Sequence, residues 1–158
     1  MNIELQRKEL ISTKKALKKE WMRKQLNIEI KTVEGSRYID DVIKRKIKEY
    51  SLSSQKRRKF LMYCIQAHLE NDYLLVKDLI KLIGISRAGA ETMIKECREA
   101  NWIRIERCDK NRRKIQATDI TVETYADYCD WLWEIIDKSE MRNLSVSINE
   151  IEKLERSF

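Results

Sequence analysis

The sequence predicts a mostly helical fold with one small β-hairpin, and three observations support this. Charged residues make up 37% of the 158 residues, whereas the chain has only 3 glycines and no proline, which favours long helices over tight turns. Apolar residues recur every three or four positions along most of the chain. The exception is residues 102–118, where two stretches of alternating polarity flank a polar turn, as in a hairpin.

The first 26 residues are expected to form an amphipathic, basic helix. Spacings of seven and four place four apolar residues on one stripe, flanked by lysines: Ile3, Leu10, Leu17 and Trp21, with Lys14, Lys15, Lys18 and Lys19. This stripe could pack on the core, pair with a second chain or lie along a duplex, and core packing is the simplest of the three. The alternation of Leu26, Ile28 and Ile30 then predicts a short strand or an irregular connection.

Two helices are expected next. Ser36 is a suitable N-cap for a helix that reaches Tyr50, and a second helix begins near Ser53 or Ser54 and ends at Asn71-Asp72. The second helix opens with a basic cluster, Lys56, Arg57, Arg58 and Lys59. Because the helix dipole disfavours cations at this end, the cluster is either solvated charge or is placed for an external anion.

Residues 76–100 predict a helix-turn-helix. A short helix over 76–83 is followed by Gly84, suited to a left-handed terminus, and by Ser86, which can cap a helix from Arg87 to about Ala100. In this second helix the apolar residues share an arc that is expected to face the core: Ala90, Met93, Ile94 and Cys97. The charged residues share the opposite, outward arc: Arg87, Glu91, Lys95 and Arg98. Small residues in its first turn, Ala88 and Gly89, let the backbone approach a partner closely.

A basic hairpin and two helices complete the chain. Asn101 suits a left-handed helix terminus, and the strands 102–108 and 113–118 flank the turn Asp109–Asn111. Thr121 is expected to cap a long helix, and a final helix is expected after Asn143.

Charge is distributed unevenly along the chain, whose net charge is +7. Residues 1–70 carry 18 Lys and Arg against 9 Asp and Glu, residues 71–120 carry 11 against 8, and residues 121–158 carry 4 against 9. This asymmetry indicates one part that faces a polyanion and another that avoids it, unless the charges only solvate helix faces.

The inventory of reactive residues favours no enzyme class. The four cysteines form no C-x-x-C pair and His68 is the single histidine, so we expect no zinc site, no disulfide framework, no cofactor and no catalytic activity. No apolar run reaches a membrane-spanning length, and we expect a cytoplasmic protein that does not bind membranes. A thiol sensor is a minor alternative, centred on Cys108 near Arg107 and Lys110.

Helix, turn, helix and basic hairpin together describe a winged helix-turn-helix, and over residues 36–140 the chain resembles the MarR (multiple antibiotic resistance regulator) family. The matching segments are, in order, Leu52-Ser53, Gly84-Ile85-Ser86-Arg87, Asn101-Trp102-Ile103, and Asn111-Arg112-Arg113-Lys114 followed by Ile120-Thr121. Asn111 stands where the family has an aspartate that orients a wing arginine, a role for which Asp109 is a possible substitute.

The resemblance implies a homodimer held by the first and last helices, here Tyr38–Tyr50 and the stretches after Thr121. We therefore expect a basic N-terminal extension (residues 1–35) and a DNA-binding and dimerisation domain (residues 36–158) whose winged-helix core covers about 53–120. Many family members respond to small phenolic or oxidising effectors, and no residue here identifies one.

The function that follows is sequence-specific binding of double-stranded DNA by a transcriptional regulator. Recognition-helix and wing candidates for DNA contact are Ser86, Arg87, Ala88, Gly89, Thr92, Lys95, Lys110, Arg112, Arg113 and Lys114, with Lys77 and residues 56–59 as further phosphate candidates. Arg112 or Arg113 would reach the minor groove.

The main alternative is a winged-helix interaction module of the replication or transcription machinery. In that case the wing and the acidic C-terminal region bind a protein, and the basic N-terminus binds nucleic acid without specificity. RNA binding is a further alternative, but the sequence lacks the aromatic sheet face on which exposed bases stack.

Overall fold

A computed structural model describes residues 2–34, 41–138 and 140–158. The chain divides into two compact units, one formed by Met1–Gly35 with Cys129–Phe158 and the other by Ser36–Tyr128. Residues 129–158 group with the N-terminal helix, because the last helix packs along it.

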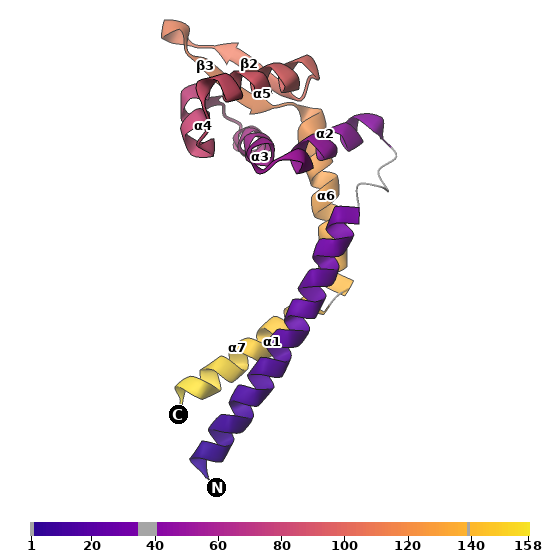
Figure 1. The fold of residues 1–158 in the computed structure, drawn as a ribbon, viewed down its shortest axis with the longest axis vertical. Helices are drawn as coiled ribbons and strands as arrows, with labels where there is room; N and C mark the ends of the chain where they lie inside the picture. Colours follow the sequence, from indigo (N-terminus) through magenta and orange to yellow (C-terminus); the bar gives the residue numbers. More distant parts are fainter. Residues whose placement is uncertain (1, 35–40, 139) are drawn as a thin grey trace. The chain divides into compact units, whose positions relative to one another are not determined.

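The first unit contains an antiparallel pair of helices, α1 (Ile3–Glu34) and α7 (Met141–Arg156), which lie side by side in Figure 1. The strand or connection expected at residues 26–33 is wrong, since α1 continues to Glu34 and buries Ile28. Likewise, the final helix begins at Met141, before Asn143.

Charge pairing joins these two helices. The Nζ atom of Lys14 lies 3.1 Å from a carboxylate oxygen of Glu155 and 3.4 Å from one of Glu152, and the Nζ atom of Lys18 lies 3.7 Å from Glu152. The basic N-terminal helix and the glutamates of α7 therefore neutralise part of each other's charge within one chain.

The second unit is a helical layer on a small sheet. Its helices are α2 (Val42–Ser53), α3 (Gln55–Leu69), α4 (Val76–Ile83), α5 (Arg87–Glu99) and the first half of α6 (Asp119–Lys138). Strands β1 (Leu74–Leu75), β2 (Ile103–Arg107) and β3 (Arg113–Ala117) form an antiparallel sheet in the order β1-β3-β2. The mostly helical fold with a small hairpin is confirmed, and it is compatible with a winged helix.

Helix boundaries follow their caps. The Ser54 hydroxyl accepts the N–H of Arg57 at the start of α3, and the Asp41 carboxylate accepts the N–H of Lys44 at the start of α2. The N-cap expected at Ser36 lies outside the described residues. The cap expected at Thr121 is wrong, because α6 begins at Asp119 and Thr121 lies inside its first turn.

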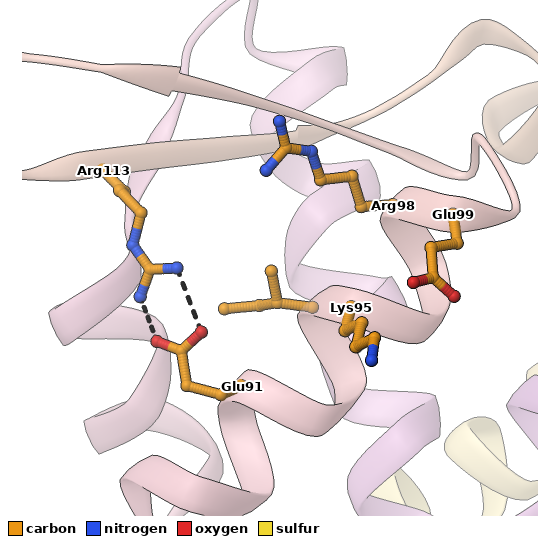
Figure 2. Close-up of a pocket in the computed structure, with 6 residues that line it drawn as sticks. Glu91, Lys95, Arg98, Glu99 and Arg113 are labelled. Carbon is orange, nitrogen blue, oxygen red and sulfur yellow. Dashed lines mark hydrogen bonds and ion pairs between the residues drawn. The ribbon is translucent and has the colours of Figure 1, made fainter.

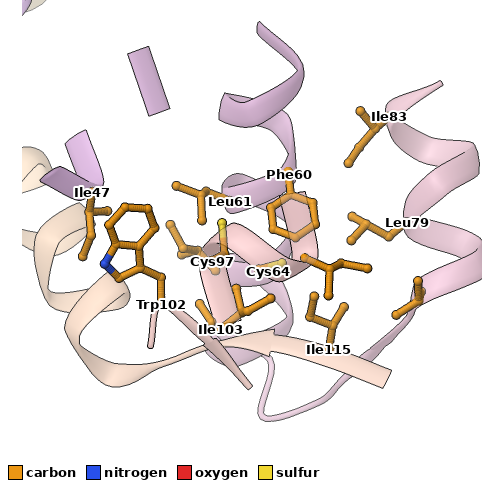
Figure 3. Packing of buried hydrophobic residues seen from close by; sticks show 14 residues of the cluster. Ile47, Phe60, Leu61, Cys64, Leu79, Ile83, Cys97, Trp102, Ile103 and Ile115 are labelled. Atoms are coloured by element: carbon orange, nitrogen blue, oxygen red, sulfur yellow. The ribbon is translucent and has the colours of Figure 1, made fainter. Parts of the chain in front are cut away.

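The core lies between the helices and β3. Phe60, Cys64 and Cys97 are completely buried, and so is Ile115 in the central strand (Figure 3). Apolar residues from α3, α4 and α5 thus pack on one cluster, which fixes the positions of the turn and of the helix that follows it.

Candidate nucleic-acid interface

The turn between α4 and α5 has the predicted geometry. Gly84 ends α4 in the left-handed conformation at φ 73°, and its N–H donates to the carbonyl of Ile80 at 3.0 Å. The Ser86 hydroxyl accepts the N–H of Gly89 at 3.0 Å, which caps α5. Ile85 packs partly buried against the core, so the turn holds the start of α5 at the surface.

Helix α5 presents a polar face to solvent and an apolar face to the core. Ala90, Ile94 and Cys97 are buried, and Met93 packs beside them. The recognition-helix candidates are exposed, except for the half-buried Gly89: Ser86, Arg87, Ala88, Thr92 and Lys95. The predicted inward and outward arcs are thus present, with the exception of Glu91, which is half-buried.

The hairpin has the predicted two strands and turn. Strands β2 and β3 pair from Ile103 opposite Ala117 to Arg107 opposite Arg113, and a short helical turn, η2 (Asp109–Asn111), joins them. Lys110 and Asn111 adopt left-handed φ angles of 62° and 58°. At the tip, Lys110 and Arg112 are exposed and, among the described residues, neither forms an ion pair.

Arg113 is held by the recognition helix. Its guanidinium donates to both carboxylate oxygens of Glu91, one of them at 3.1 Å, so that the two side chains face each other across a gap between α5 and β3 (Figure 2). Hydrogen bonding to Arg113 holds the pKa of Glu91 below its ordinary value, against a smaller opposing effect of burial. Asp109, the expected substitute for the family's aspartate, forms no ion pair with either wing arginine in the described part of the chain.

Lys114 is also engaged within the protein. Its Nζ atom lies 3.5 Å from the Glu106 carboxylate on the neighbouring strand and 4.7 Å from the centroid of the Tyr73 ring. The Tyr73 hydroxyl donates to Glu106 at 2.9 Å. Of the four wing candidates, Lys110 and Arg112 therefore have exposed charge, whereas Arg113 and Lys114 are paired.

The basic cluster at the start of α3 is divided in the same way. Arg57 lies over the Tyr50 ring at 5.0 Å and 3.6 Å from the Glu96 carboxylate on α5, so it ties α3 to the recognition helix. Lys56, Arg58 and Lys59 are exposed, as is Lys77 on α4. These four cations are thus available to an external anion.

Sequence reasoning missed two contacts of this surface. It placed Glu91 among solvated residues and Arg113 at the free tip, although the two are partners separated by 22 positions. It also missed β1, whose two residues pair with Ile115 and Lys114. Neither feature has a local sequence signal.

A hollow lies between α5 and the start of β3. A volume of about 470 Å³ is lined by Glu91, Ile94, Lys95, Arg98, Glu99 and Arg113. No group of three or more His, Cys, Asp or Glu side chains is placed to hold a metal within residues 2–34, 41–138 and 140–158. Across the same residues, no helix combines the length and the apolar character needed to cross a bilayer.

No family model matches the chain, and no curated protein matches it. A solved structure of AbfR in its disulfide-formed state is similar over 90% of this chain and 97% of that chain, with 17% identity and a TM-score of 0.41.

Proposed function

We propose that the protein binds double-stranded DNA sequence-specifically, as a homodimer, and acts as a MarR-like transcriptional regulator in the cytoplasm, without enzymatic activity. One observation carries the proposal: the capped first turn of α5 is exposed beside a hairpin tip with two exposed cations. A helix fits the major groove of B-DNA, whereas a basic hairpin reaches the adjacent groove or backbone.

Each exposed residue has a role in this complex. Arg87 and Thr92 face base edges, and the Ser86 hydroxyl and first-turn amides face phosphate. Ala88 and Gly89 allow close approach because their side chains occupy little space. Arg112 enters the minor groove, and Lys110 contacts phosphate. Lys95 is exposed one turn beyond Glu91 and extends the basic face of α5.

The homodimer is supported by exposed apolar side chains in the first unit. Met22, Leu26 and Ile30 of α1 are 57%, 57% and 55% exposed, and they recur at the helical spacing of four. Trp133 of α6 is 62% exposed. Burial of such a stripe against a second copy would remove it from water. A two-fold dimer then requires a nearly palindromic site with half-sites about 10 bp apart, or a multiple of this spacing.

The test of DNA binding begins with selection of bound duplexes from a random pool. Fluorescence anisotropy then compares a selected duplex with a random one. We expect Arg87→Ala to weaken selected DNA about tenfold more than random DNA, since a good arginine contact to a base is worth about 1–3 kcal/mol. Lys110→Ala should weaken both alike. Arg98→Ala, an exposed arginine in the last turn of α5, is the matched control.

Equal affinity of the wild-type protein for both duplexes would refute specific recognition. Sedimentation tests assembly separately, and we expect Leu26→Glu to give a monomer while the helical circular dichroism is retained. A wild-type monomer without duplex preference would instead favour the protein-interaction module. An unchanged dimer in Leu26→Glu would exclude this stripe from the interface.

A further inference from the structure

An ion pair joins α5 to the start of β3 beside a hollow in the surface. Glu91 and Arg113 line the same hollow of about 470 Å³ as Lys95, Arg98 and Glu99. The side chains that line this hollow are charged, apart from the apolar Ile94. Figure 2 shows the two-oxygen contact of Glu91 with Arg113 bridging the helix and the strand.

The contact between Arg113 and Glu91 fixes the relative orientation of the two side chains as well as the distance between them. A guanidinium that donates to both oxygens of one carboxylate holds the two groups coplanar. Arg113 is the first residue of β3, directly after the exposed Arg112, and Glu91 lies one helical turn after Arg87. The pair therefore connects the residue next to the hairpin tip with the first turns of the helix.

The pair is too exposed to stabilise the fold much. The Arg113 and Glu91 side chains are 28% and 42% exposed, and surface ion pairs usually contribute little to stability. We therefore expect the pair to affect the orientation of the hairpin relative to α5 more than the stability of the fold.

From this arrangement, and given the proposed DNA binding, we propose that Glu91 is a positioning residue for DNA discrimination. Through Arg113 it holds the hairpin at a fixed angle to α5, so that Arg112 and Arg87 address one duplex together. Arg113 acts within the protein and does not itself contact DNA.

Two matched variants test this role first. Glu91→Gln removes the ion pair, whereas Glu99→Gln removes the same charge from the same hollow, where Glu99 has no ion pair among the described residues. Loss of a carboxylate beside DNA raises affinity for any duplex, so both variants should bind random DNA slightly better. The ratio of selected to random affinity should fall about tenfold in Glu91→Gln and stay unchanged in Glu99→Gln.

Charge exchange provides the rescue. The single variants Glu91→Arg and Arg113→Glu should each lose discrimination, and the double variant E91R/R113E should regain most of it, because it restores the pair with the wild-type net charge. If the pair were merely structural, these variants would change in unfolding temperature, but the ratio of selected to random DNA affinity would not fall in the single variants and recover in the double variant. Equal ratios for Glu91→Gln and Glu99→Gln, or no rescue in the double variant, would overturn the proposal.

A measurement without DNA separates this proposal from the proposed function. The Cys108 N–H donates to the carbonyl of Arg112 at 2.7 Å and closes the hairpin turn. Amide hydrogen exchange at Cys108 should accelerate several-fold in Glu91→Gln and not in Glu99→Gln. Unchanged exchange would refute the positioning role. If wild-type protein shows no duplex preference, DNA recognition fails, and the exchange experiment alone decides whether Glu91 holds the hairpin.

Discussion

The side-chain hydroxyl of Thr121 donates a hydrogen bond to the carbonyl oxygen of Trp102 across 2.7 Å, and Thr121 is completely buried. The same carbonyl accepts the N–H of Thr118 at 3.0 Å. The first turn of α6 is thereby joined to the residue that leads into β2. Thr121 thus connects the hairpin to the following helix, a role that its position in a first turn does not reveal.

Replacement of Thr121 by valine keeps the side-chain shape and removes this hydrogen bond. We expect Thr121→Val to lower the free energy of unfolding by about 0.5–1.5 kcal/mol, because one net hydrogen bond is lost while the Trp102 carbonyl keeps the N–H of Thr118 as a donor. Urea denaturation measures the change. Thr121→Ser, which retains the hydroxyl, should lose less, and equal losses in both variants would indicate packing as the main contribution.

The cap of α5 offers a second prediction. Ser86 and Ser54 accept backbone N–H groups at 3.0 Å and 3.1 Å in the same way, at the starts of α5 and α3. Ser86→Ala and Ser54→Ala should each destabilise the protein by about 1 kcal/mol. Anisotropy should show the larger loss of DNA affinity for Ser86→Ala, since this cap orders the turn that approaches phosphate. Similar affinity losses would remove Ser86 from the interface.

A substitution at Gly89 distinguishes an effect on stability from an effect on the close approach of the α5 backbone to DNA. Its Cβ position would lie 3.2 Å from the Ser86 hydroxyl oxygen, and alanine favours a helix over glycine by about 1 kcal/mol. Gly89→Ala should therefore change the thermal midpoint little while it weakens DNA binding. At Gly84 the opposite is expected. A methyl group would meet no atom within 4 Å, but the left-handed φ of 73° disfavours alanine, so Gly84→Ala should lower the thermal midpoint. DNA affinity unaffected by Gly89→Ala would contradict the close contact.

The Glu91–Arg113 pair predicts a defined dependence on pH. Because the pKa of Glu91 is lowered in the folded protein, its contribution to stability is complete above about pH 4.5 and is lost as the pH falls through the lower folded-state value. The contribution is small, about 0.5 kcal/mol or less, since the pair is exposed. Urea titrations of wild type and Glu91→Gln should converge below pH 4.5. A difference that grows in acid would contradict this sign.

The four cysteines should differ in reactivity. Cys129 is exposed and Cys108 is half-buried, whereas Cys64 and Cys97 are completely buried. Burial raises the pKa of both buried thiols, that of Cys97 to about 12, so little thiolate is present at neutral pH. Timed alkylation read by mass spectrometry should modify Cys129 first, Cys108 next, and the buried pair only on unfolding. Rapid modification of native Cys97 would contradict this order.

Local signals explain which features could be predicted from the sequence. Gly84, Ser86 and Asn101 each favour one backbone conformation, and the structure has all three as expected. The alternation at Leu26, Ile28 and Ile30 misled, because Leu26 and Ile30 are exposed on a helix and only Ile28 is buried. An alternating pattern indicates a strand only when one of its faces packs on a core.

Contacts between distant residues could not be predicted. A glutamate on an outward helical arc is usually solvated, and nothing near Glu91 or Arg113 in the sequence signals their pairing. Similarly, the acidic C-terminal region, residues 121–158, could be assigned to a foreign partner until the structure placed its Glu152 and Glu155 against Lys14. Charge counts give the total, but the fold decides which charges are already neutralised.

The internal pairing of Arg113 and Lys114 also alters what a salt titration should report. Each phosphate neutralised by a protein cation releases condensed counterions and adds about 0.9 to the slope of log affinity against log salt concentration. Two wing cations that already pair with Glu91 and Glu106 displace no such ions. A count of all four basic wing candidates would therefore overestimate the slope by about 1.8.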